Sequence, residues 1–337
     1  MSERIANTTF GGKEATQSYG AVAKLSIGYR ASIAGISEVL IPFLKTLNNK
    51  GIVPDLLEVG GGQGTSAWAL KKIFRDNKVF RFIFTGTEFV LDQIRKGHNK
   101  LNEKIDLRLI PPKIQVKAEE LPFSEGKFDA VVGSQMIHWL ETKEALKQHF
   151  SDALRVLKPG GKLVHATSGI VDLEQYNASH FTRHPFVLNA YLPALEKELT
   201  KKGYWKKENG EFVPWNPKVN PAYHKFTLNM FREILEEVGF KNIQIHLNMA
   251  PLNRKEIKMR LTNLAFLNMH FFTGEFAKNI SPKERVRMAK KAYREACKNM
   301  TDGILIFSSL PQEVIIGEIP EGSFGEPVPV ITADKPS

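Results

Sequence analysis

The sequence predicts an α/β protein in which helices cover both faces of a doubly wound, mostly parallel sheet of seven strands. Three observations predict this class. A short apolar run, Leu56 to Val59, leads into a glycine turn and then a helical stretch, as in the first unit of an open α/β sheet. Apolar strands and helical stretches keep alternating as far as Thr167. Two later segments, rich in aromatic and basic residues, interrupt the pattern and predict a helical cap.

The composition indicates a globular chain with a sizeable core. Its 337 residues are 42% hydrophobic, and no run approaches the roughly 20 apolar residues of a membrane span. The polar, acidic start at residues 1–4 differs from a secretory signal, so we expect a cytoplasmic protein. The single cysteine, Cys297, excludes an internal disulfide framework and a cysteine-rich zinc site.

The net charge of +11 is compatible with nucleic acid, an anionic membrane surface or an acidic substrate as a partner. Lysines are spread along the chain and form no dense block, so charge alone does not choose among these partners. The sequence carries no signal for an oligomeric state.

The glycine turn after the first strand is the strongest local signal. Gly60, Gly62 and Gly64 allow a tight turn and a close approach to a ligand at a helix N-terminus. The dinucleotide fingerprint would need a glycine at position 65, where Thr65 stands, so a pyrophosphate is disfavoured. Glu58, two residues before the turn, would repel a pyrophosphate and suits a ligand with a positive charge.

These four positions resemble motif I of the class I S-adenosylmethionine-dependent methyltransferases, in which an acidic residue precedes three alternate glycines. The string from Leu154 to Leu163 is characteristic of the same family. The resemblance covers residues 55–168 well and residues 226–247 moderately. It implies a Rossmann-like fold and S-adenosyl-L-methionine as cofactor. Methyl transfer from a sulfonium requires no metal.

The second strand, Phe80 to Thr87, is followed by Glu88. At this position of an open parallel sheet one carboxylate can accept hydrogen bonds from both ribose hydroxyls. Glu88 is therefore predicted to hold the ribose, and the alternative is an exposed acid at a strand end. Phe89 is placed to lie against the face of the adenine.

A helix from Leu91 to Asn99 and a third strand from Lys113 to Lys117 precede a second candidate segment. The resemblance implies that Glu119 accepts the proton of the adenine amine and that Ala118 supplies backbone. The alternative for both residues is a solvated loop.

The fourth strand, residues 128–134, is nearly continuous in apolar character, as expected of a strand buried on both faces. At its carboxyl end, Ser134 and Gln135 are predicted on the cofactor side. His138 is the candidate general base, and packing in the pocket wall is its alternative role. Trp139 is predicted to contact the acceptor.

The segment after the fourth strand also bears on the acceptor. Enzymes that methylate nucleic-acid bases or glutamine amides carry Asn/Asp-Pro-Pro-Tyr/Phe there, and this chain does not, which argues against nucleic acid as a partner. The pair His138-Trp139 resembles the small-molecule and carboxyl methyltransferases of the trans-aconitate and malonyl-carrier-protein kind.

The remaining core is predicted to follow at wider spacing. We expect a helix at Lys143–Leu157 and a fifth strand at Lys162–Thr167. A second helix is expected at Phe226–Phe240, a sixth strand at Asn242–Leu247 and a last strand at Glu313–Ile319. The predicted core thus comprises residues 19–169, 226–249 and 303–319. Residues 1–18 are expected to be flexible, and residues 320–337 to form an extended, loosely attached tail.

Two insertions, residues 170–225 and 250–302, are predicted to form the cap on the substrate side. The helix from Ile257 to Phe272 is more apolar than one packing face requires, which indicates a pocket wall, and Phe266, Met269 and His270 are its candidate acceptor contacts.

Three further features of the sequence have alternative interpretations. His180 and His184 lack a third ligand of matching spacing, so no metal site is predicted. Tyr19 and Tyr29 are candidates for a lid over the cofactor, with packing against the sheet as the alternative. The helix after Ser281 has a basic face, which is either solvated or a partner site.

The sequence predicts direct transfer of a methyl group to a small-molecule acceptor, through a carboxylate or hydroxyl oxygen. A carboxylate is ionised at neutral pH, whereas a hydroxyl must lose a proton to a base. The alternatives are a macromolecular methyltransferase acting on RNA or protein, and a cofactor-binding protein without catalysis.

Overall fold

The computed structural model of the chain describes residues 27–91, 94, 113–140, 142–167, 186–206, 226–251, 254–272, 275–299, 315–316 and 325–337. Several predictions lie outside these residues. They include the flexibility of residues 1–18, the lid role of Tyr19, most of the helix from Leu91 to Asn99, and the histidines His180 and His184 of the first insertion.

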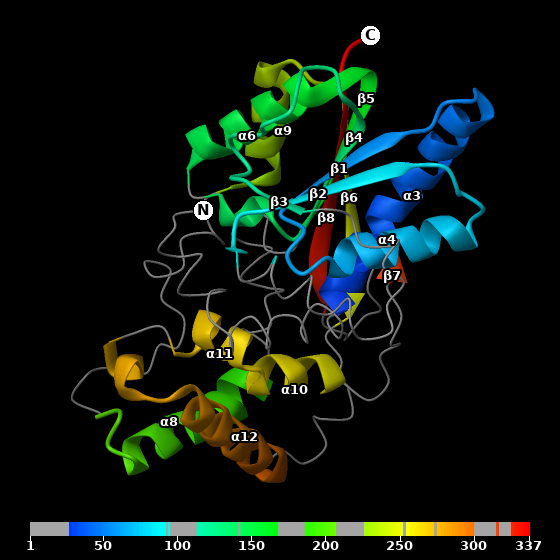
Figure 1. Ribbon diagram of the computed structural model, residues 1–337. Coiled ribbons are helices and arrows are strands. Elements are labelled where there is room, and N and C mark those ends of the chain that lie inside the picture. The colour runs from blue at the N-terminus through cyan, green and yellow to red at the C-terminus, as the bar shows by residue number, and fades with distance from the viewer. Residues whose placement is uncertain are drawn as a thin grey trace.

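One eight-stranded sheet, in the order β3-β2-β1-β4-β5-β8-β6-β7, forms the centre of the described chain (Figure 1). Strands β1 to β5 pair in parallel, and β8 is antiparallel to both of its neighbours. The predicted Rossmann-like, mostly parallel sheet is confirmed. The strands are β1 (Asp55–Val59), β2 (Ile83–Glu88), β3 (Lys113–Gln115), β4 (Phe128–Ser134), β5 (Leu157–Ala166), β6 (Lys241–Pro251), β7 (Ile315–Ile316) and β8 (Gly325–Asp334).

The C-terminal end of the chain differs from the prediction. The expected last strand, Glu313–Ile319, is represented by the two-residue edge strand β7, and the expected loose tail contains β8, which lies between β5 and β6. Residues 330–332 and Asp334 pair with both neighbours, whereas Pro327 and Pro329 pair with β6 and lie outside the pairing with β5. The carbonyl of Pro329 also accepts the N–H of Thr167, just past the end of β5, at 3.1 Å. A strand tolerates proline, which lacks a backbone donor, at such positions beyond its second neighbour. Because of these prolines, the sequence predicted a loose tail where the structure has an inner strand of the sheet.

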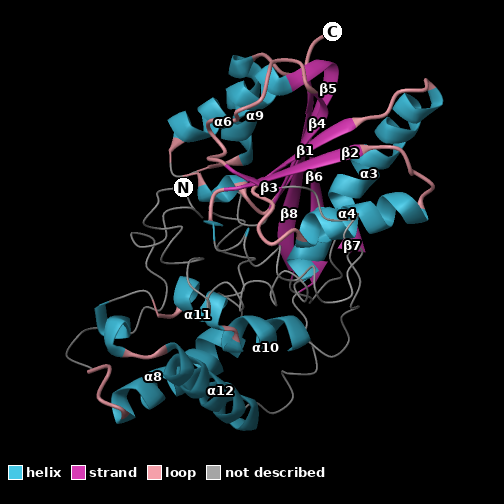
Figure 2. Cartoon of the chain, viewed as in Figure 1, coloured by secondary structure: helices cyan, strands magenta, loops and turns pink. Residues whose placement is uncertain are grey.

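Helices cover both faces of the sheet (Figures 1 and 2). One layer holds α3 (Ile27–Asn49) and α4 (Thr65–Asp76), and the other holds α6 (Lys143–Val156) and α9 (Leu228–Val238). Adjacent residues of β1 pack against different helix layers, because successive side chains of a strand point to opposite faces of the sheet. Leu56 belongs to the buried cluster with α3 and α4, and Leu57 to the cluster with α6 and α9.

The ends of α6 and α9 follow from their capping residues. Thr142 accepts a hydrogen bond from the backbone N–H of Ala145 at 3.1 Å, and Thr227 accepts one from Met230 at 3.2 Å. Gly239 ends α9 with a φ of 109°. A left-handed glycine of this kind stops a helix without steric strain. Both predicted helices are therefore confirmed, within about two residues at each end.

The cap helices lie together beyond one end of the sheet (Figure 1). The single helix expected from Ile257 to Phe272 is divided in two at Asn263. Tyr191 ties the group together, since its buried hydroxyl donates to the carbonyl of Leu261 at 2.9 Å. The cap elements are a π-helical turn (Val187–Tyr191), α8 (Leu192–Lys201), α10 (Arg254–Thr262), α11 (Leu264–His270), a 3-10 turn (Glu275–Asn279) and α12 (Pro282–Asn299).

The cap has an apolar core of its own, which includes Leu261, Leu267 and Ala289. Val90 and Trp139, which follow β2 and β4, belong to the same cluster. The cap therefore packs at the carboxyl ends of the parallel strands. Among the described helices, none is both long and apolar enough to cross a membrane.

Candidate functional site

An open cavity lies at the carboxyl ends of β1, β2 and β4. Ligands of open α/β sheets bind at this edge. The lining comes from the glycine turn, the end of β2, the segment after β3 and the segment after β4. It consists of Gly60, Gly62, Glu88, Phe89, Val90, Val116, Lys117, Ala118, Glu119, Gln135, Met136, Trp139 and Leu140.

The glycine turn forms one wall. Gly60, Gly62 and Gly64 have φ angles of 68°, 52° and 84°, in the left-handed region that side chains disfavour. A Cβ on Gly60 would stand 2.7 Å from the Cβ of Met136, and one on Gly62 would enter open space. The turn therefore exposes bare backbone to the cavity, and its first glycine has no room for a side chain.

Glu88 joins the end of β2 to the turn. Its carboxylate accepts hydrogen bonds from the backbone N–H of Gly62 at 2.7 Å and of Val90 at 2.9 Å. The side chain is only 7% exposed, yet it lines the cavity. A carboxylate offers about four acceptor positions. Two backbone donors thus hold Glu88 in place while it can still accept from a bound diol.

Glu58 lies beneath the turn and is not among the lining residues, although the sequence predicted it to face a cationic ligand. Its carboxylate is 1% exposed and accepts a hydrogen bond from the hydroxyl of Ser66. A Cβ on Gly61 would stand 2.3 Å from Glu58 Oε2. The carboxylate therefore packs against the backbone of the turn, which it supports from below.

The segment after β3 forms the opposite wall. Ala118 and Glu119 are both in the lining, as expected of the adenine-side loop. The carbonyl of Ala118 accepts a hydrogen bond from His149 Nδ1 of α6 at 2.9 Å. Lys117 also lines the cavity and pairs with Glu120 at 3.6 Å on the exposed side.

Gln135 follows β4 in an uncommon conformation, with a φ of 56°. Its backbone N–H donates to the carbonyl of Ala166 at 2.8 Å, and its Nε2 donates to the hydroxyl of Ser32 in α3 at 2.5 Å. Non-glycine residues with positive φ concentrate at functional sites. Gln135 lines the cavity, whereas the buried Ser134 does not.

His138 and Trp139 lie in a 3-10 turn, η2 (Ile137–Trp139), but have different surroundings. Trp139 lines the cavity and packs into the cap core. His138 is not in the lining, is 3% exposed and shares a hydrogen bond between Nδ1 and the hydroxyl of Thr167. Burial lowers the pKa of His138 to about 3. The imidazole is therefore neutral at pH 7, and its pKa is too low to suit the predicted role as a base.

Of the cap residues predicted to contact the acceptor, Phe266 has a described side chain, and it is not in the cavity lining. Phe266 is buried in the cap core, where the guanidinium of Arg260 lies 5.3 Å from the centre of its ring. Met269 and His270 belong to α11, and their side chains lie outside the described part of the chain. Tyr29, the other candidate for the lid, packs against the core between α3 and the sheet.

Apolar residues complete the lining, and sequence reasoning did not single them out. Each of Val90, Val116, Met136 and Leu140 stands within two residues of a predicted site residue. Their position just after a strand end was the available signal. Within the described residues, no group of three or more His, Cys, Asp or Glu side chains is arranged to hold a metal.

Comparison with known proteins agrees with this geometry. Residues 57–165, from β1 to the end of β5, match the family model of the methyltransferase domain. A malonyl-[acyl-carrier protein] O-methyltransferase of Hahella chejuensis is 22% identical over 235 residues, which cover 68% of this chain and 76% of that protein. The protein of the same name from Geobacter sulfurreducens is 28% identical over 153 residues, 45% of this chain and 53% of its own.

Among solved structures, the phosphoethanolamine N-methyltransferase 2 of Haemonchus contortus, in complex with S-adenosyl-L-methionine, has a TM-score of 0.48 at 15% identity. The superposition covers 99% of this chain and 60% of that one.

Proposed function

Because this chain is a class I S-adenosylmethionine-dependent methyltransferase, we propose that it methylates a carboxylate oxygen of a small-molecule acceptor. The cofactor, S-adenosyl-L-methionine, supplies when bound a methyl group on a positively charged sulfur. The cavity fits this cofactor. The turn leaves bare backbone where side chains would otherwise stand, and the held carboxylate of Glu88 suits a ribose diol.

We assign the cofactor contacts along the lining. Glu88 would accept from the ribose hydroxyls, Phe89 would lie against the adenine face, and Ala118 with Glu119 would meet the adenine edge. The acceptor would lie toward Trp139, where the cavity meets the cap.

The burial of His138 away from the cavity lining is the observation that favours a carboxylate. A hydroxyl or a protonated amine must lose a proton before it can attack, and the buried imidazole of His138, with a pKa of about 3, is a poor agent for that step. A carboxylate with a pKa near 4 is already ionised at pH 7. In its transfer the oxygen–carbon bond forms as the carbon–sulfur bond breaks, and no proton moves.

The protein's task is then alignment. Holding two reactants in line contributes up to roughly 7 to 11 kcal/mol in the best intramolecular systems. Met136, Trp139 and Leu140 supply an apolar wall beside the turn. Such a wall excludes water from an ionised acceptor, which strengthens its attraction to a positively charged donor.

The names of the two sequence relatives support the same class of acceptor. Both are called malonyl-[acyl-carrier protein] O-methyltransferases, so a malonyl thioester is the first acceptor to test.

The test uses cofactor labelled in the methyl group, with malonyl thioesters, free dicarboxylates and hydroxyl compounds as acceptors. Transfer to a carboxylate gives a methyl ester, which mild alkali hydrolyses to volatile labelled methanol. We expect alkali-labile label from a carboxylate acceptor and a pH–rate profile of the same shape in His138→Asn. The proposed carboxylate acceptor would be wrong, and a hydroxyl or amine acceptor favoured, if the transferred methyl label were stable to alkali. The same would follow if the pH–rate profile of His138→Asn lost a limb that the wild type has.

A macromolecular acceptor is the second candidate, and the net charge of +11 is the observation that favours it. Binding to RNA would weaken steeply with salt, because cationic side chains release counterions from the phosphates. Affinity for RNA that is measurable at 50 mM salt and falls by orders of magnitude at 200 mM, together with label in the RNA, would favour this candidate over the first.

A further inference from the structure

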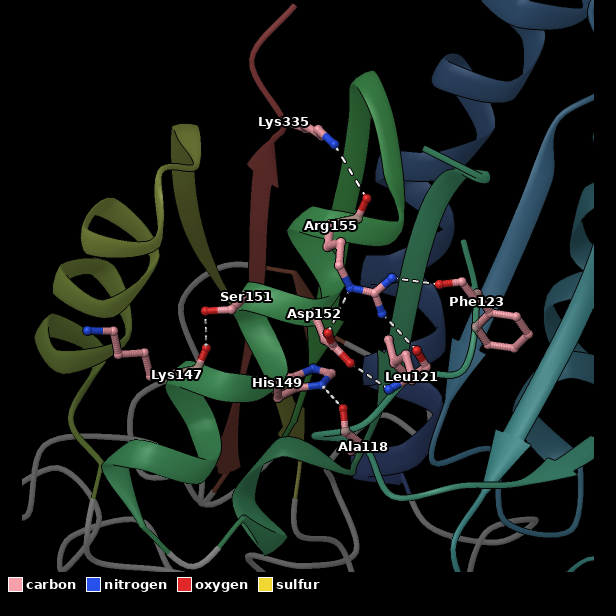
Figure 3. A network of polar contacts seen from close by, with 9 residues as sticks. All are labelled: Ala118, Leu121, Phe123, Lys147, His149, Ser151, Asp152, Arg155 and Lys335. Atoms are coloured by element: carbon pink, nitrogen blue, oxygen red, sulfur yellow. Dashed lines mark hydrogen bonds and ion pairs between the residues drawn. The ribbon is translucent and has the colours of Figure 1, made fainter. Parts of the chain in front are cut away.

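We infer that one face of helix α6 is a template that fixes the shape of the loop at residues 118–123, and that this shape sets the affinity for the adenine end of the cofactor. His149, Asp152 and Arg155 are the positioning residues of this template (Figure 3). The inference rests on the proposed placement of the adenine against this loop. It does not depend on the identity of the acceptor.

The three side chains stand three residues apart on the helix and point to the same side. Arg155 donates through Nη2 to the carbonyl of Leu121 at 2.7 Å and through Nη1 to that of Phe123 at 2.6 Å. Asp152 accepts the backbone N–H of Leu121 at 2.5 Å. Every one of these contacts is made to loop backbone, so the template defines the path of the loop whatever side chains the loop carries.

The guanidinium is itself held in place. Its Nε donates to Asp152 Oδ1 at 3.0 Å, and the Asp152 side chain is 13% exposed. An arginine can reach two carbonyls and a carboxylate at once because its five donors form a planar fork, which a lysine ammonium cannot reproduce. Beyond the loop, Gly126 N–H donates to the carbonyl of Arg155 at 3.0 Å, so the tie continues to the start of β4.

His149 fixes the end of the loop that lines the cavity. Its Nδ1 faces the carbonyl of Ala118, which only accepts hydrogen bonds, so Nδ1 must carry the proton. Nε2 of His149 lies 3.1 Å from Nε2 of His165. His165 in turn lies against Gly133, where an added Cβ would stand 2.1 Å from Nδ1. The contact between the two rings joins α6 to β5.

Both rings are completely buried, and burial lowers the pKa of each below its ordinary value. The ionisable groups that bear on His149 are Glu119 from the loop, Asp152 from its own helix and His165 from β5. Nδ1 of His149 donates to Ala118 in this neutral tautomer and in the protonated ring alike, so the contact does not depend on the protonation state.

A loop held in its bound shape binds more tightly than one that must be ordered by the ligand. The template should therefore favour adenine over a base with a different edge. S-adenosylhomocysteine and S-inosylhomocysteine provide the comparison, because oxygen replaces the exocyclic amine in the second. A general loss of folding would weaken the binding of both ligands by the same factor. A displaced loop would instead reduce the preference for S-adenosylhomocysteine over S-inosylhomocysteine.

The experiment measures the dissociation constant of both ligands by calorimetry for the full chain. Arg155→Lys and His149→Leu are expected to weaken S-adenosylhomocysteine about 10-fold each and to reduce its preference over the inosine analogue. His149→Asn keeps a donor near the position of Nδ1 and is expected to stay within about 3-fold of the wild type. The matched control is Ser151→Ala on the same helix, whose hydroxyl bonds only the helix carbonyl of Lys147 (Figure 3).

The inference is overturned if Arg155→Lys and His149→Leu, with melting temperatures near that of the wild type, keep the affinity and the preference. It is also overturned if they weaken the two ligands by the same factor, or if His149→Asn behaves like His149→Leu. Glu119→Ala separates the inference from the proposed placement. If Glu119→Ala keeps the wild-type preference for S-adenosylhomocysteine over S-inosylhomocysteine, the proposed placement of the adenine is refuted. If Glu119→Ala loses this preference but Arg155→Lys keeps it, the template role of α6 is refuted.

Discussion

The cavity at the strand ends and the helical cap keep their shapes by different kinds of contact. Around the cavity, backbone groups are bound at short distances: Gly61 N–H donates to the carbonyl of Thr87 at 2.8 Å, and Gly62 N–H donates to Glu88 at 2.7 Å. In the cap, buried apolar side chains such as Leu261 and Leu267 pack against one another. A few residues therefore determine the shape of the cavity, whereas many residues together determine the shape of the cap.

This difference explains what each region requires of its residues. A backbone turn with positive φ and no space for a Cβ accepts only glycine, as at Gly60. A packed core accepts many combinations of apolar residues of similar volume. Substitutions at the cavity should therefore act on ligand affinity, and substitutions in the cap core should act on stability.

The largest effect on affinity is expected for Gly60→Val. The new side chain would meet the Cβ of Met136, and its backbone would be strained at a φ of 68°. We expect the affinity for S-adenosylhomocysteine to fall at least about 100-fold, or about 2.7 kcal/mol, by calorimetry.

Gly160→Ala is the matched control for Gly60→Val. Gly160 has a φ of 73°, but nothing stands within 4 Å of an added Cβ. It should lower the free energy of unfolding by about 1 kcal/mol and leave ligand affinity unchanged. Equal losses of affinity in the two variants would show that strain alone, and not the space at the turn, determines binding.

Leu261→Ala tests the cap. Leu261 is fully buried, and removal of its side chain leaves a cavity in the cap core. We expect a loss of about 2 to 5 kcal/mol in the free energy of unfolding, measured with urea. The affinity for S-adenosylhomocysteine should stay within about 2-fold of the wild type, because no cavity-lining residue is changed.

Leu188→Ala is the control for this variant, because Leu188 is 39% exposed. It should change the free energy of unfolding by less than about 0.5 kcal/mol. If Leu261→Ala weakened the cofactor product strongly while the protein remained folded, the separation of the two regions would be refuted.

Acid should destabilise the fold through His138, whose pKa is lowered by burial to about 3. Above pH 6.5 the ring is neutral in both the folded and the unfolded chain. As the pH falls below 6.5 the unfolded chain binds a proton that the folded chain excludes, so stability is lost by up to about 1.4 kcal/mol per pH unit.

The measurement is urea unfolding of the wild type and His138→Gln at pH 7.5, 6.5 and 5.5. His149 and His165 titrate in both proteins, so the difference between the two curves isolates His138. We expect the wild type to lose more stability than the variant below pH 6.5. Parallel curves would contradict the buried, neutral imidazole.

The smallest effect is expected for Phe89→Leu. Leucine keeps an apolar side chain in the lining but has no aromatic ring to lie against the adenine. The loss should be about 0.5 to 1.5 kcal/mol, or about 2- to 10-fold in the dissociation constant of S-adenosylhomocysteine. Phe82→Leu, at a ring that packs on Phe74 away from the cavity, is the control and should leave the dissociation constant unchanged.

The same difference determined how much of the site could be predicted from the sequence. Gly60, Gly62 and Glu88 were predicted from their positions after strands, and Ala118 and Glu119 from the resemblance to the methyltransferase family; all five line the cavity. Backbone-built sites leave motifs, because few residue types satisfy them. The template on α6 left no such signal, because its contacts join residues about 30 positions apart.

Burial and long-range pairing account for the places where the structure differs from what the sequence suggested. A histidine after a strand suggested a base, but local sequence does not show that His138 is enclosed. Pro327 and Pro329 suggested a loose tail, because the partner strand β6 lies about 80 residues earlier in the chain. In the cap, an apolar excess around Phe266 suggested a pocket wall, whereas the described side chains of Phe266, Leu267 and Phe271 lie in the cap core.

The central claim is that the cavity beside the glycine turn holds the cofactor through Glu88. Calorimetric titration of S-adenosyl-L-methionine and S-adenosylhomocysteine into the wild type and Glu88→Ala tests it most directly. We predict binding of both ligands to the wild type and a loss of about 100-fold in Glu88→Ala, because the variant removes both the acceptor for the ribose and the support of Gly62. No heat with either ligand in the wild type, or an unchanged affinity in Glu88→Ala, would contradict the claim.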